Sequence, residues 1–270
     1  MKYPKLKIIA ILALACGCIL YVDQGLTPKV NNVELRLAGG TKDLQPLRIA
    51  LLSDLHVADN VRSLEDLDEL WSDVLLSHPD IIMLAGDYVN NGGQRRDISQ
   101  LRLQISRVIG AAGDIPVVAV LGNHDQWSKA SLWARDLRAA GIIVLENQVA
   151  TLDSLGVCVR GFGDAFTGQF SYIDFPARCD GKLHISLAHD PAAAFDPRIR
   201  GLVLAGHTHC GQIALPFVGP LYVPSAAPKE AHCGIYEDGQ RQVFVSSGVG
   251  TSVIPLRLFA QSQWDLITLN

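Results

Sequence analysis

Between residues 47 and 140, short apolar runs alternate with longer amphipathic stretches, and few folds accommodate such an alternation. The runs are apolar on both faces, as strands buried inside a sheet are, and they cover 47–53, 81–85 and 116–121. The stretches between them carry apolar residues at helical spacing and cover 63–78, 97–112 and 128–140. Ser63 and Asp66 form a capping-box pattern at the first of these helices. We therefore expect a βαβαβα arrangement in which helices cover a sheet.

The second half of the chain is richer in strands than in helices. Strand-like runs cover 142–145, 157–160, 184–188, 202–205, 242–245 and 264–269. The segments 161–181 and 215–239 are irregular and rich in Gly, Pro and aromatic residues, which predicts loops at the rim of a site. No long linker follows residue 46, so we expect one α/β domain over 46–270, with a mixed sheet or two packed sheets.

The charge balance argues against nucleic acid as a stable partner. The chain has 23 Lys and Arg against 27 Asp and Glu, which gives a formal net charge of −4 and a pI near 6.0. A mildly acidic chain offers no electrostatic attraction to phosphate backbones. Hydrophobic residues make up 49% of the chain and charged residues 19%, a composition that excludes a wholly disordered protein.

Residues 1–30 differ from the rest of the chain. Lys2, Lys5 and Lys7 precede an uncharged apolar run over 8–22. As a helix this run would be roughly 22 Å long, short of the ~30 Å hydrocarbon core of a bilayer unless flanking lysines reach to the surface. We favour an uncleaved membrane anchor. The alternatives are a signal peptide cleaved after Ala15 and a lipoprotein acylated on Cys16 or Cys18.

The remaining four cysteines are Cys158, Cys179, Cys210 and Cys233, which allow three complete pairings. No CxxC pair is present, which argues against a thiolate zinc knuckle. We expect buried free thiols, with disulfides as the alternative. The positive-inside rule places the N-terminal lysines in the cytoplasm and the domain outside it.

Polar side chains gather at the predicted strand ends. Because the carboxyl ends of strands in open α/β sheets meet at one edge, we expect them to lie together. They come from five strands and comprise Asp54, His56, Asp87, Asn123, His124, Asp125, His189, His207 and His209. One Asp after a strand is usually a turn former, and one isolated His is usually structural. Burying this many polar groups without compensation would cost several kcal/mol each, whereas a bound metal would offset that cost.

The spacing of these residues suggests how they reach a metal. In Asp54-Leu55-His56 and His207-Thr208-His209 the polar residues are two apart, and in an extended segment such residues point the same way. Gly86 precedes Asp87 and leaves the chain free to turn tightly, and Gly122 and Gly206 offer the same freedom.

The ordered motifs DxH, GD, GNHD, a later His and GHxH resemble those of the calcineurin-like metallophosphoesterase family. The likeness covers roughly residues 46–270, and it is greatest to a bacterial single-anchor phosphodiesterase subgroup, which has GHTHGGQ where this chain reads GHTHCGQ. It implies a four-layer α/β/β/α sandwich with mixed sheets. It also implies two divalent metal ions, one held by Asp54, His56 and His209 and the other by Asn123, His189 and His207, with Asp87 bridging both. Imidazole and carboxylate ligands suit Mn, Fe or Zn.

The same resemblance suggests the catalytic residues and the chemistry. We hypothesise that a hydroxide bridging two metals ~3.5–4 Å apart attacks phosphorus directly, without a covalent enzyme intermediate. His124 is then a catalytic residue rather than a ligand, and it hydrogen-bonds transition-state oxygens or protonates the leaving group. Asp125 is expected to orient His124, with a helix-capping role as the equal alternative.

The expected function is a membrane-associated hydrolase of phosphodiester or pyrophosphate bonds, located at the bacterial inner membrane as a single-pass protein. A lipid-linked substrate is attractive because the anchor would hold the site near the bilayer, although lipid pyrophosphatases with these motifs need cytoplasmic access. The rival hypothesis is a catalytically idle metal-binding scaffold. For Asp164, Arg257 and the aromatic residues of 162–175 we favour structural roles; the alternatives are hydrogen bonds to the ligands for the first two and an apolar lip for the aromatic stretch.

Overall fold

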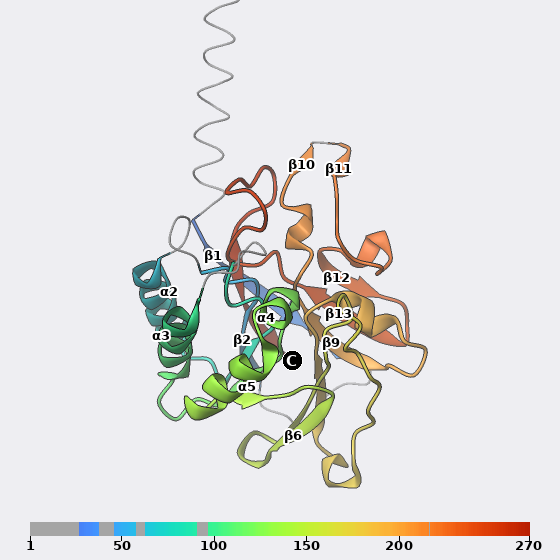
Figure 1. Ribbon diagram of the computed structural model, residues 1–270. Coiled ribbons are helices and arrows are strands. Elements are labelled where there is room, and N and C mark those ends of the chain that lie inside the picture. The colour runs from blue at the N-terminus through green and yellow to red at the C-terminus, as the bar shows by residue number, and fades with distance from the viewer. Residues whose placement is uncertain (1–26, 38–45, 58–62, 91–96, 216) are drawn as a thin grey trace, which may run out of the picture.

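The computed structural model describes residues 27–37, 46–57, 63–90, 97–215 and 217–270, and two six-stranded sheets form its framework (Figure 1). The first sheet has the order β1-β14-β2-β3-β4-β5, formed by Lys29–Leu35, Gln263–Leu269, Leu47–Leu52, Ile81–Leu84, Val117–Ala119 and Ile143–Val144. Strands β2 to β5 are parallel, and β14 runs antiparallel to β2. The sheet is therefore mixed, as expected.

The second sheet has the order β12-β13-β9-β8-β7-β6. Its strands are Gly234–Glu237, Arg241–Val245, Gly201–Ala205, Leu183–Leu187, Val157–Gly161 and Gln148–Leu152. The four central strands are parallel, and the edge strands β12 and β6 are antiparallel to their neighbours. A separate two-stranded hairpin consists of β10 (Ala214–Leu215) and β11 (Gly219–Pro220).

Helices cover the outer face of the first sheet, seen on the left of Figure 1. They are α2 (Leu64–Leu76), α3 (Ser99–Gly110) and α5 (Ala130–Ala139), and their buried side chains pack against β2, β3 and β4 in one apolar cluster. The capping box predicted at α2 is present: Ser63 accepts a hydrogen bond from the N–H of Asp66, and Asp66 accepts one from the N–H of Ser63. The predicted third helix over 128–140 is α5, and a short helix that we did not predict, α4 (Asn123–Trp127), precedes it, with Lys129 at φ 75° between the two.

A second apolar cluster joins the two sheets face to face. It includes Ile49 and Met83 of the first sheet and Val159, Ile185 and Leu204 of the second. A third cluster covers the outer face of the second sheet with the 3₁₀ helix η3 (Pro191–Phe195) and neighbouring loops. The predicted four-layer α/β/β/α order is therefore confirmed, with 3₁₀ turns and loops forming most of the fourth layer.

Two differences from the sequence analysis concern chain segments. Strand β1 joins the first sheet although it precedes the predicted domain boundary at residue 46. Residues 1–26 of the predicted N-terminal segment lie outside the described residues, so the anchor stays a prediction. Within the described ranges, no helix combines the length and the apolar character that crossing a bilayer requires.

The expectation of free thiols was wrong. Cys158 pairs with Cys179, and Cys210 pairs with Cys233, with Cα atoms 5.8 Å and 4.9 Å apart. The first disulfide joins β7 to the 3₁₀ helix η2 (Ala177–Cys179). The second fastens the loop that follows β9 to the segment before β12. Sequence spacing did not predict these pairs, because each depends on which loops the sheet order brings together.

Candidate metal centre

Three loops at the carboxyl ends of β2, β3 and β9 carry most of the candidate ligands. The loops hold one another through the backbone, since Asp54 N–H donates to the carbonyl of Gly86 and His56 N–H donates to that of Asp87. Five candidate ligands have positive φ between 47° and 68°: Asp54, His56, Asp87, His207 and His209. Our expectation that extended backbone aligns the i and i+2 pairs was therefore wrong, because left-handed turns direct these side chains into the site.

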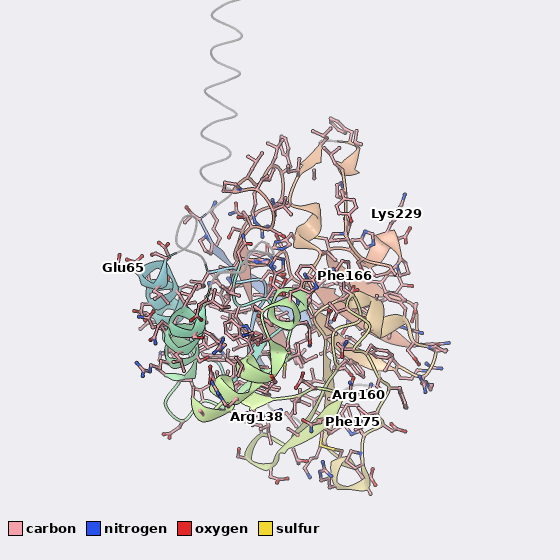
Figure 2. The ribbon with its side chains drawn as sticks, viewed as in Figure 1. Glu65, Arg138, Arg160, Phe166, Phe175 and Lys229 are labelled. Atoms are coloured by element: carbon pink, nitrogen blue, oxygen red, sulfur yellow. A yellow bond between two sulfur atoms is a disulfide. The ribbon has the colours of Figure 1, made fainter. Side chains whose placement is uncertain are left out.

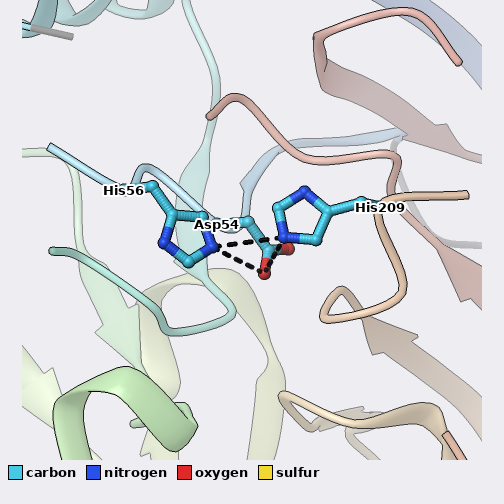
Figure 3. A group of neighbouring side chains, drawn as sticks. All are labelled: Asp54, His56 and His209. Atoms are coloured by element: carbon cyan, nitrogen blue, oxygen red, sulfur yellow. Dashed lines mark hydrogen bonds and ion pairs between the residues drawn. The ribbon is translucent and has the colours of Figure 1, made fainter. Parts of the chain in front are cut away.

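Asp54, His56 and His209 form the first group of potential ligands (Figure 3). Asp54 Oδ1 lies 3.8 Å from His56 Nε2 and 3.5 Å from His209 Nε2, and the two ring nitrogens are 3.2 Å apart. All three side chains are buried. The other carboxylate oxygen of Asp54 accepts hydrogen bonds from Ser53 Oγ and from the N–H of His207. The carboxylate is thereby fixed with Oδ1 directed at the two rings.

The second group consists of Asp87, His189 and His207. His189 Nε2 lies 3.4 Å from Asp87 Oδ2, 3.1 Å from His207 Nδ1 and 3.0 Å from Asn123 Oδ1. The outward nitrogens of the two rings contact backbone carbonyls: His189 Nδ1 lies 2.6 Å from Ala85 O, and His207 Nε2 lies 2.6 Å from Pro224 O. As donors to these carbonyls, the rings direct lone pairs at each other and at the carboxylate when they are neutral.

Asp87 lies between the two groups. Its Oδ2 is 3.6 Å from His56 Nε2 and 3.4 Å from His189 Nε2, and its Oδ1 accepts a hydrogen bond from the N–H of His124. Gly122 allows this approach, because a Cβ there would stand 2.3 Å from Asp87 Oδ1. Gly122 therefore serves close packing at φ −100°, whereas Gly86 provides the tight turn at φ 89°.

The electrostatics of the site favour a cation. Burial lowers the pKa of His56 and of His209, and the charge of Arg257 lowers that of His209 further, so both rings are neutral. Burial would also lower the pKa of His189, but the charge of Asp87 outweighs it and raises that pKa well above 6.5. The negative charge of Asp87 thus stabilises a positive charge beside His189.

Unpaired polar atoms provide a test of whether a metal fits. Asp54 Oδ1, His56 Nδ1 and His124 Nδ1 are buried and have no hydrogen-bond partner among the described residues. Of these atoms, Asp54 Oδ1 lies among the ring nitrogens of the first ligand group, and such an atom is costly to bury uncompensated. The donor set of carboxylate, imidazole and amide oxygen is one that Mn, Fe and Zn accept. The residues present therefore fit divalent metal ions.

His124 lies beside the ligands without a settled partner for its ring. Its imidazole packs edge-on to that of His56, with ring centres 4.7 Å apart. Burial lowers the pKa of His124. A third possible ligand group includes His124 together with His56 and Asp87. The geometry is thus compatible with a ligand as well as with the catalytic residue that we predicted.

The predicted contact between Asp125 and His124 is absent from the described structure. Asp125 instead accepts hydrogen bonds from the N–H groups of Asp87, Tyr88 and Gly122, at 2.8 to 3.0 Å. Burial and the neighbouring Asp87 raise the pKa of Asp125, against the effect of these donors. The residue joins the loop after β3 to the start of α4, which is closer to the capping alternative than to the catalytic one.

Two aromatic residues lie at the rim of the site: Trp127, which the sequence analysis did not consider, and Phe166, for which it favoured a structural role. Trp127 is 55% exposed, and its ring centre lies 5.0 Å from that of His124 and 6.2 Å from that of Phe166. Phe166 in turn contacts the ring of His207 at 4.8 Å. Figure 2 shows Phe166 well apart from Phe175, which stacks on His184. Only Phe166 of the predicted aromatic stretch reaches the site. The i, i+3 spacing of His124 and Trp127 on α4 was the available signal.

Arg257 forms a hydrogen bond to a candidate ligand, which was the less favoured of its two predicted roles. It is fully buried, and its Nη2 lies 3.0 Å from His209 Nδ1 and within 3.0 Å of the carbonyls of Ser247, Gly248 and Gly250. Asp164 remains structural, since its carboxylate accepts hydrogen bonds from Phe166 and Thr167. Arg257 thus fixes the ring of His209 from behind.

The chain was compared with protein families and with known proteins, and it is similar to several phosphoesterases. The profile of the calcineurin-like phosphoesterase family matches residues 47–211. The chain is 32% identical over 263 residues to the phosphodiesterase YaeI of Escherichia coli (strain K12), covering 94% of this chain and 92% of that protein. It is 30% identical over 230 residues to an uncharacterized metallophosphoesterase, YkuE, of Bacillus subtilis (strain 168), covering 83% and 79%. A Danio rerio transmembrane protein with a metallophosphoesterase domain is 28% identical over 96% of this chain and 62% of its own length.

Proposed function

This chain belongs to the calcineurin-like phosphoesterase family and is a hydrolase of phosphoric esters, and from that premise we propose that it is a phosphodiesterase with two divalent metal ions at the centre described above. Asp54, His56 and His209 would hold one ion. Asn123, His189 and His207 would hold the other, and Asp87 would contact both. The observation that carries this proposal is the position of Asp87 Oδ2, 3.6 Å and 3.4 Å from histidines of two different groups.

Bound divalent ions would supply Lewis acidity towards a phosphoryl oxygen and an attacking water. The protein supplies the orientation. Ser53 and the backbone of His207 fix Asp54, the carbonyls of Ala85 and Pro224 fix two imidazoles, and Arg257 fixes a third. The two carbonyls accept from the outward ring nitrogens and so keep His189 and His207 in the tautomer with an inward lone pair. Arg257, which can only donate, holds the ring of His209 in its orientation.

We assign His124 to the phosphoryl oxygens rather than to a metal. Its pKa is lowered by burial, so the ring is neutral near pH 7 and donates a hydrogen bond more readily than it transfers a proton. Of the two roles considered from the sequence, hydrogen bonding to the developing charge is therefore the better supported. Asp125 acts indirectly, because it accepts hydrogen bonds from the backbone of the loop that carries Asp87 and so positions that loop.

The exposed rings at the rim support an organic diester as substrate. Trp127 and Phe166 contact the rings of His124 and His207, so a group attached to a phosphate at the centre would meet apolar surface. A relative of 32% identity is named a phosphodiesterase. A lipid-linked diester or pyrophosphate fits the same surface and is our preferred subclass.

We further propose that the protein is anchored in the bacterial inner membrane by its N-terminal segment, with the catalytic domain over 46–270 outside the cytoplasm. The uncharged run over 8–22 supports the anchor. Two disulfides support an oxidising compartment, because cytosolic thiols are kept reduced. They count against a substrate that is accessible only from the cytoplasm.

The rival proposal is a catalytically idle scaffold that binds metal. A scaffold needs no group for the transition state, whereas His124 lies beside the ligands with Nδ1 buried and unpaired within the described part of the chain. This observation favours the enzyme.

The test is a substrate screen on the purified full chain. The chain is stripped of metal, reloaded with Mn²⁺, Fe²⁺ or Zn²⁺, and assayed with diesters, monoesters, pyrophosphates and lipid extracts. We expect diester hydrolysis that depends on added metal and that is lost in Asp87→Asn, with Asp114→Asn, an exposed loop residue, as the matched control. Two bound ions without turnover on any substrate would establish the scaffold instead.

A further inference from the structure

The β10–β11 hairpin carries an unusual concentration of exposed apolar side chains. They are Leu215, Phe217, Val218, Leu221 and Tyr222, and Phe217 is fully exposed at its tip. A hairpin of this kind has no core of its own to bury these side chains against. Contiguous exposed apolar side chains usually mark a contact with a partner or a membrane.

A second segment extends this surface. The loop over 251–259 exposes Val253, Ile254 and Phe259, with Val253 at 92%. The two segments form one hydrogen-bonded unit, because Ile213 pairs with Leu258 and the side chain of Gln212 bonds the backbone of Ser252 and Ile254. We refer to the exposed apolar side chains of the hairpin and of this loop as the apolar end surface.

The two segments that form the apolar end surface carry almost no charged residues of their own. No Asp, Glu, Lys or Arg occurs between Arg200 and Lys229, and Arg257 is the one such residue between Arg241 and Asp265. The guanidinium of Arg257 is buried against backbone carbonyls and does not face solvent. Burying the apolar end surface in an apolar medium would therefore dehydrate no charged side chain of these segments.

The described chain begins beside the same end of the molecule. Gln261 donates a hydrogen bond to the carbonyl of Thr27, and Lys29 N–H donates to that of Ser262. Figure 1 shows the start of β1, the red loop and the β10–β11 hairpin at the upper end of the molecule. Val22, which ends the uncharged run, is five residues before Thr27, a distance of at most about 18 Å in extended chain.

We propose that the apolar end surface is a second membrane contact, which inserts its side chains into the interfacial region of the lipid bilayer. This inference rests on the proposed membrane association and adds to it a site in the folded domain. A short tether places Thr27 near the bilayer, and the adjacent uncharged surface then meets lipid. Tyr222 suits such a position because its ring is apolar and its hydroxyl can remain hydrated.

The contact would also orient the metal centre. Leu215 follows His209 by six residues, and the Cys210–Cys233 disulfide fastens the intervening loop. Inserted side chains of the hairpin would hold the loop of His207 and His209 close to the membrane surface. Phosphoesters in lipid headgroups then lie nearer to the centre than esters in bulk water.

Tryptophan quenching in the full chain tests the proposal. Phe217→Trp and Val253→Trp place a reporter on the apolar end surface, and Leu76→Trp, 72% exposed at the end of α2, is the matched control. Each variant is reconstituted into vesicles of phosphatidylcholine and phosphatidylglycerol with brominated acyl chains, and the signal of the four native tryptophans is subtracted. We expect the emission added at 217 and 253 to be quenched at least about twofold more than that added at 76, with a blue shift.

The controls separate the possible failures. Vesicle flotation of the same samples shows whether the chain binds membrane at all, and metal-dependent diester hydrolysis in detergent reports the activity independently. Flotation with equal quenching at 217, 253 and 76 would overturn the inference and leave the anchor standing. Loss of flotation would overturn both. Equal quenching together with a dimer that Phe217→Asp dissociates would identify a second copy of the chain as the occupant.

Discussion

Backbone conformation is the residue-scale feature that distinguishes the metal centre. Left-handed φ values are uncommon for residues other than glycine, yet Asp54, His56, Asp87, His207 and His209 all have them. Such residues cost of order 1 kcal/mol or more each and persist where the surroundings enforce them. Here the enforcing contacts are backbone hydrogen bonds between the loops, and each strained turn brings a polar atom into the centre.

His124 is the residue on which the assignment of roles depends. We expect His124→Ala to keep its metal and to lose ~10²–10³ in kcat, because the transition state loses a positioned hydrogen-bond donor. His124→Gln should recover part of that loss, since an amide also donates. Metal content is measured by elemental analysis beside kcat. Loss of a metal in His124→Ala would identify His124 as a ligand and contradict our assignment.

Trp127 gives a prediction about substrate preference. Its exposed ring is expected to contact the organic group of a bound diester, a contact of about 0.5–1.5 kcal/mol. Trp127→Ala should therefore raise KM for an aryl or long-chain diester about two- to tenfold, whereas KM for a small alkyl diester should not change. Steady-state kinetics on both substrates decide this. A similar rise for both substrates would point to a general structural effect, and Trp127→Phe should behave like the wild type.

At the scale of secondary-structure elements, cross-links hold the ligand loops to the sheets. The loop of His207 and His209 is fastened by the Cys210–Cys233 disulfide and by the hydrogen bond from Thr208 to the carbonyl of His232. The Cys158–Cys179 disulfide closes a loop of similar length on β7. Only the Cys210–Cys233 disulfide adjoins a loop that carries candidate metal ligands. The effects of the two disulfides on metal binding can therefore be distinguished.

Removal of each disulfide should therefore have a different result. Closing loops of 21 and 23 residues contributes about 3 kcal/mol each to stability in the chain-entropy account. Cys233→Ser and Cys179→Ser should both lower Tm, but only Cys233→Ser should also weaken metal binding. Thermal unfolding and metal titration test this. Equal metal affinity in both variants would show that the second disulfide does not position the ligand loop.

The pairing of β1 with β14 should depend on pH through Asp265. Asn31 and Gln263 donate to this buried carboxylate, and burial raises its pKa to about 6. Its unfolded pKa is about 3.9, so the protonated form favours the folded state, and about 3 kcal/mol of stability is lost as pH rises from about 4 to about 6. Asp265→Asn should remove this loss. The Tm difference between variant and wild type is measured across that range, and a constant difference would refute the prediction.

At the scale of the whole molecule, the proposed location draws on two features, the disulfides and the N-terminal apolar run. An oxidising compartment and an apolar tether both agree with a domain held outside the cytoplasmic membrane. The loop of the apolar end surface leads to Gln261, which contacts Thr27, and its hairpin follows the loop of His207 and His209 in the chain.

The predicted location can be tested on the full chain in bacterial cells. We expect the protein in the membrane fraction, with Cys158, Cys179, Cys210 and Cys233 protected from a thiol reagent until reduction. Alkylation before and after reduction, with peptide mass mapping, identifies each cysteine. Reaction of all four without reduction would place the domain in a reducing compartment and contradict the proposed orientation.

The local sequence pattern was sufficient to predict the central strands and the helices of residues 63–140. It was also sufficient to predict that the candidate ligands lie together. Buried strands are apolar on both faces, and parallel strands end at a common edge, so strand-end residues such as Asp54, Asp87 and Asn123 are bound to converge. The strands of the two large sheets that we missed, β1, β6 and β12, are all sheet edges, where one side meets solvent or loops and the apolar pattern is weak.

The remaining features depend on contacts between distant segments, and no local pattern encodes them. The carbonyl of Ala85 orients His189 across 104 residues of sequence, and Asp125 binds the backbone of Asp87 rather than the adjacent His124. The disulfide partners and the apolar end surface likewise arise from which loops the sheet order places side by side. Strand order and loop packing are properties of the whole chain's free-energy minimum, which is why they appear only when the molecule is folded.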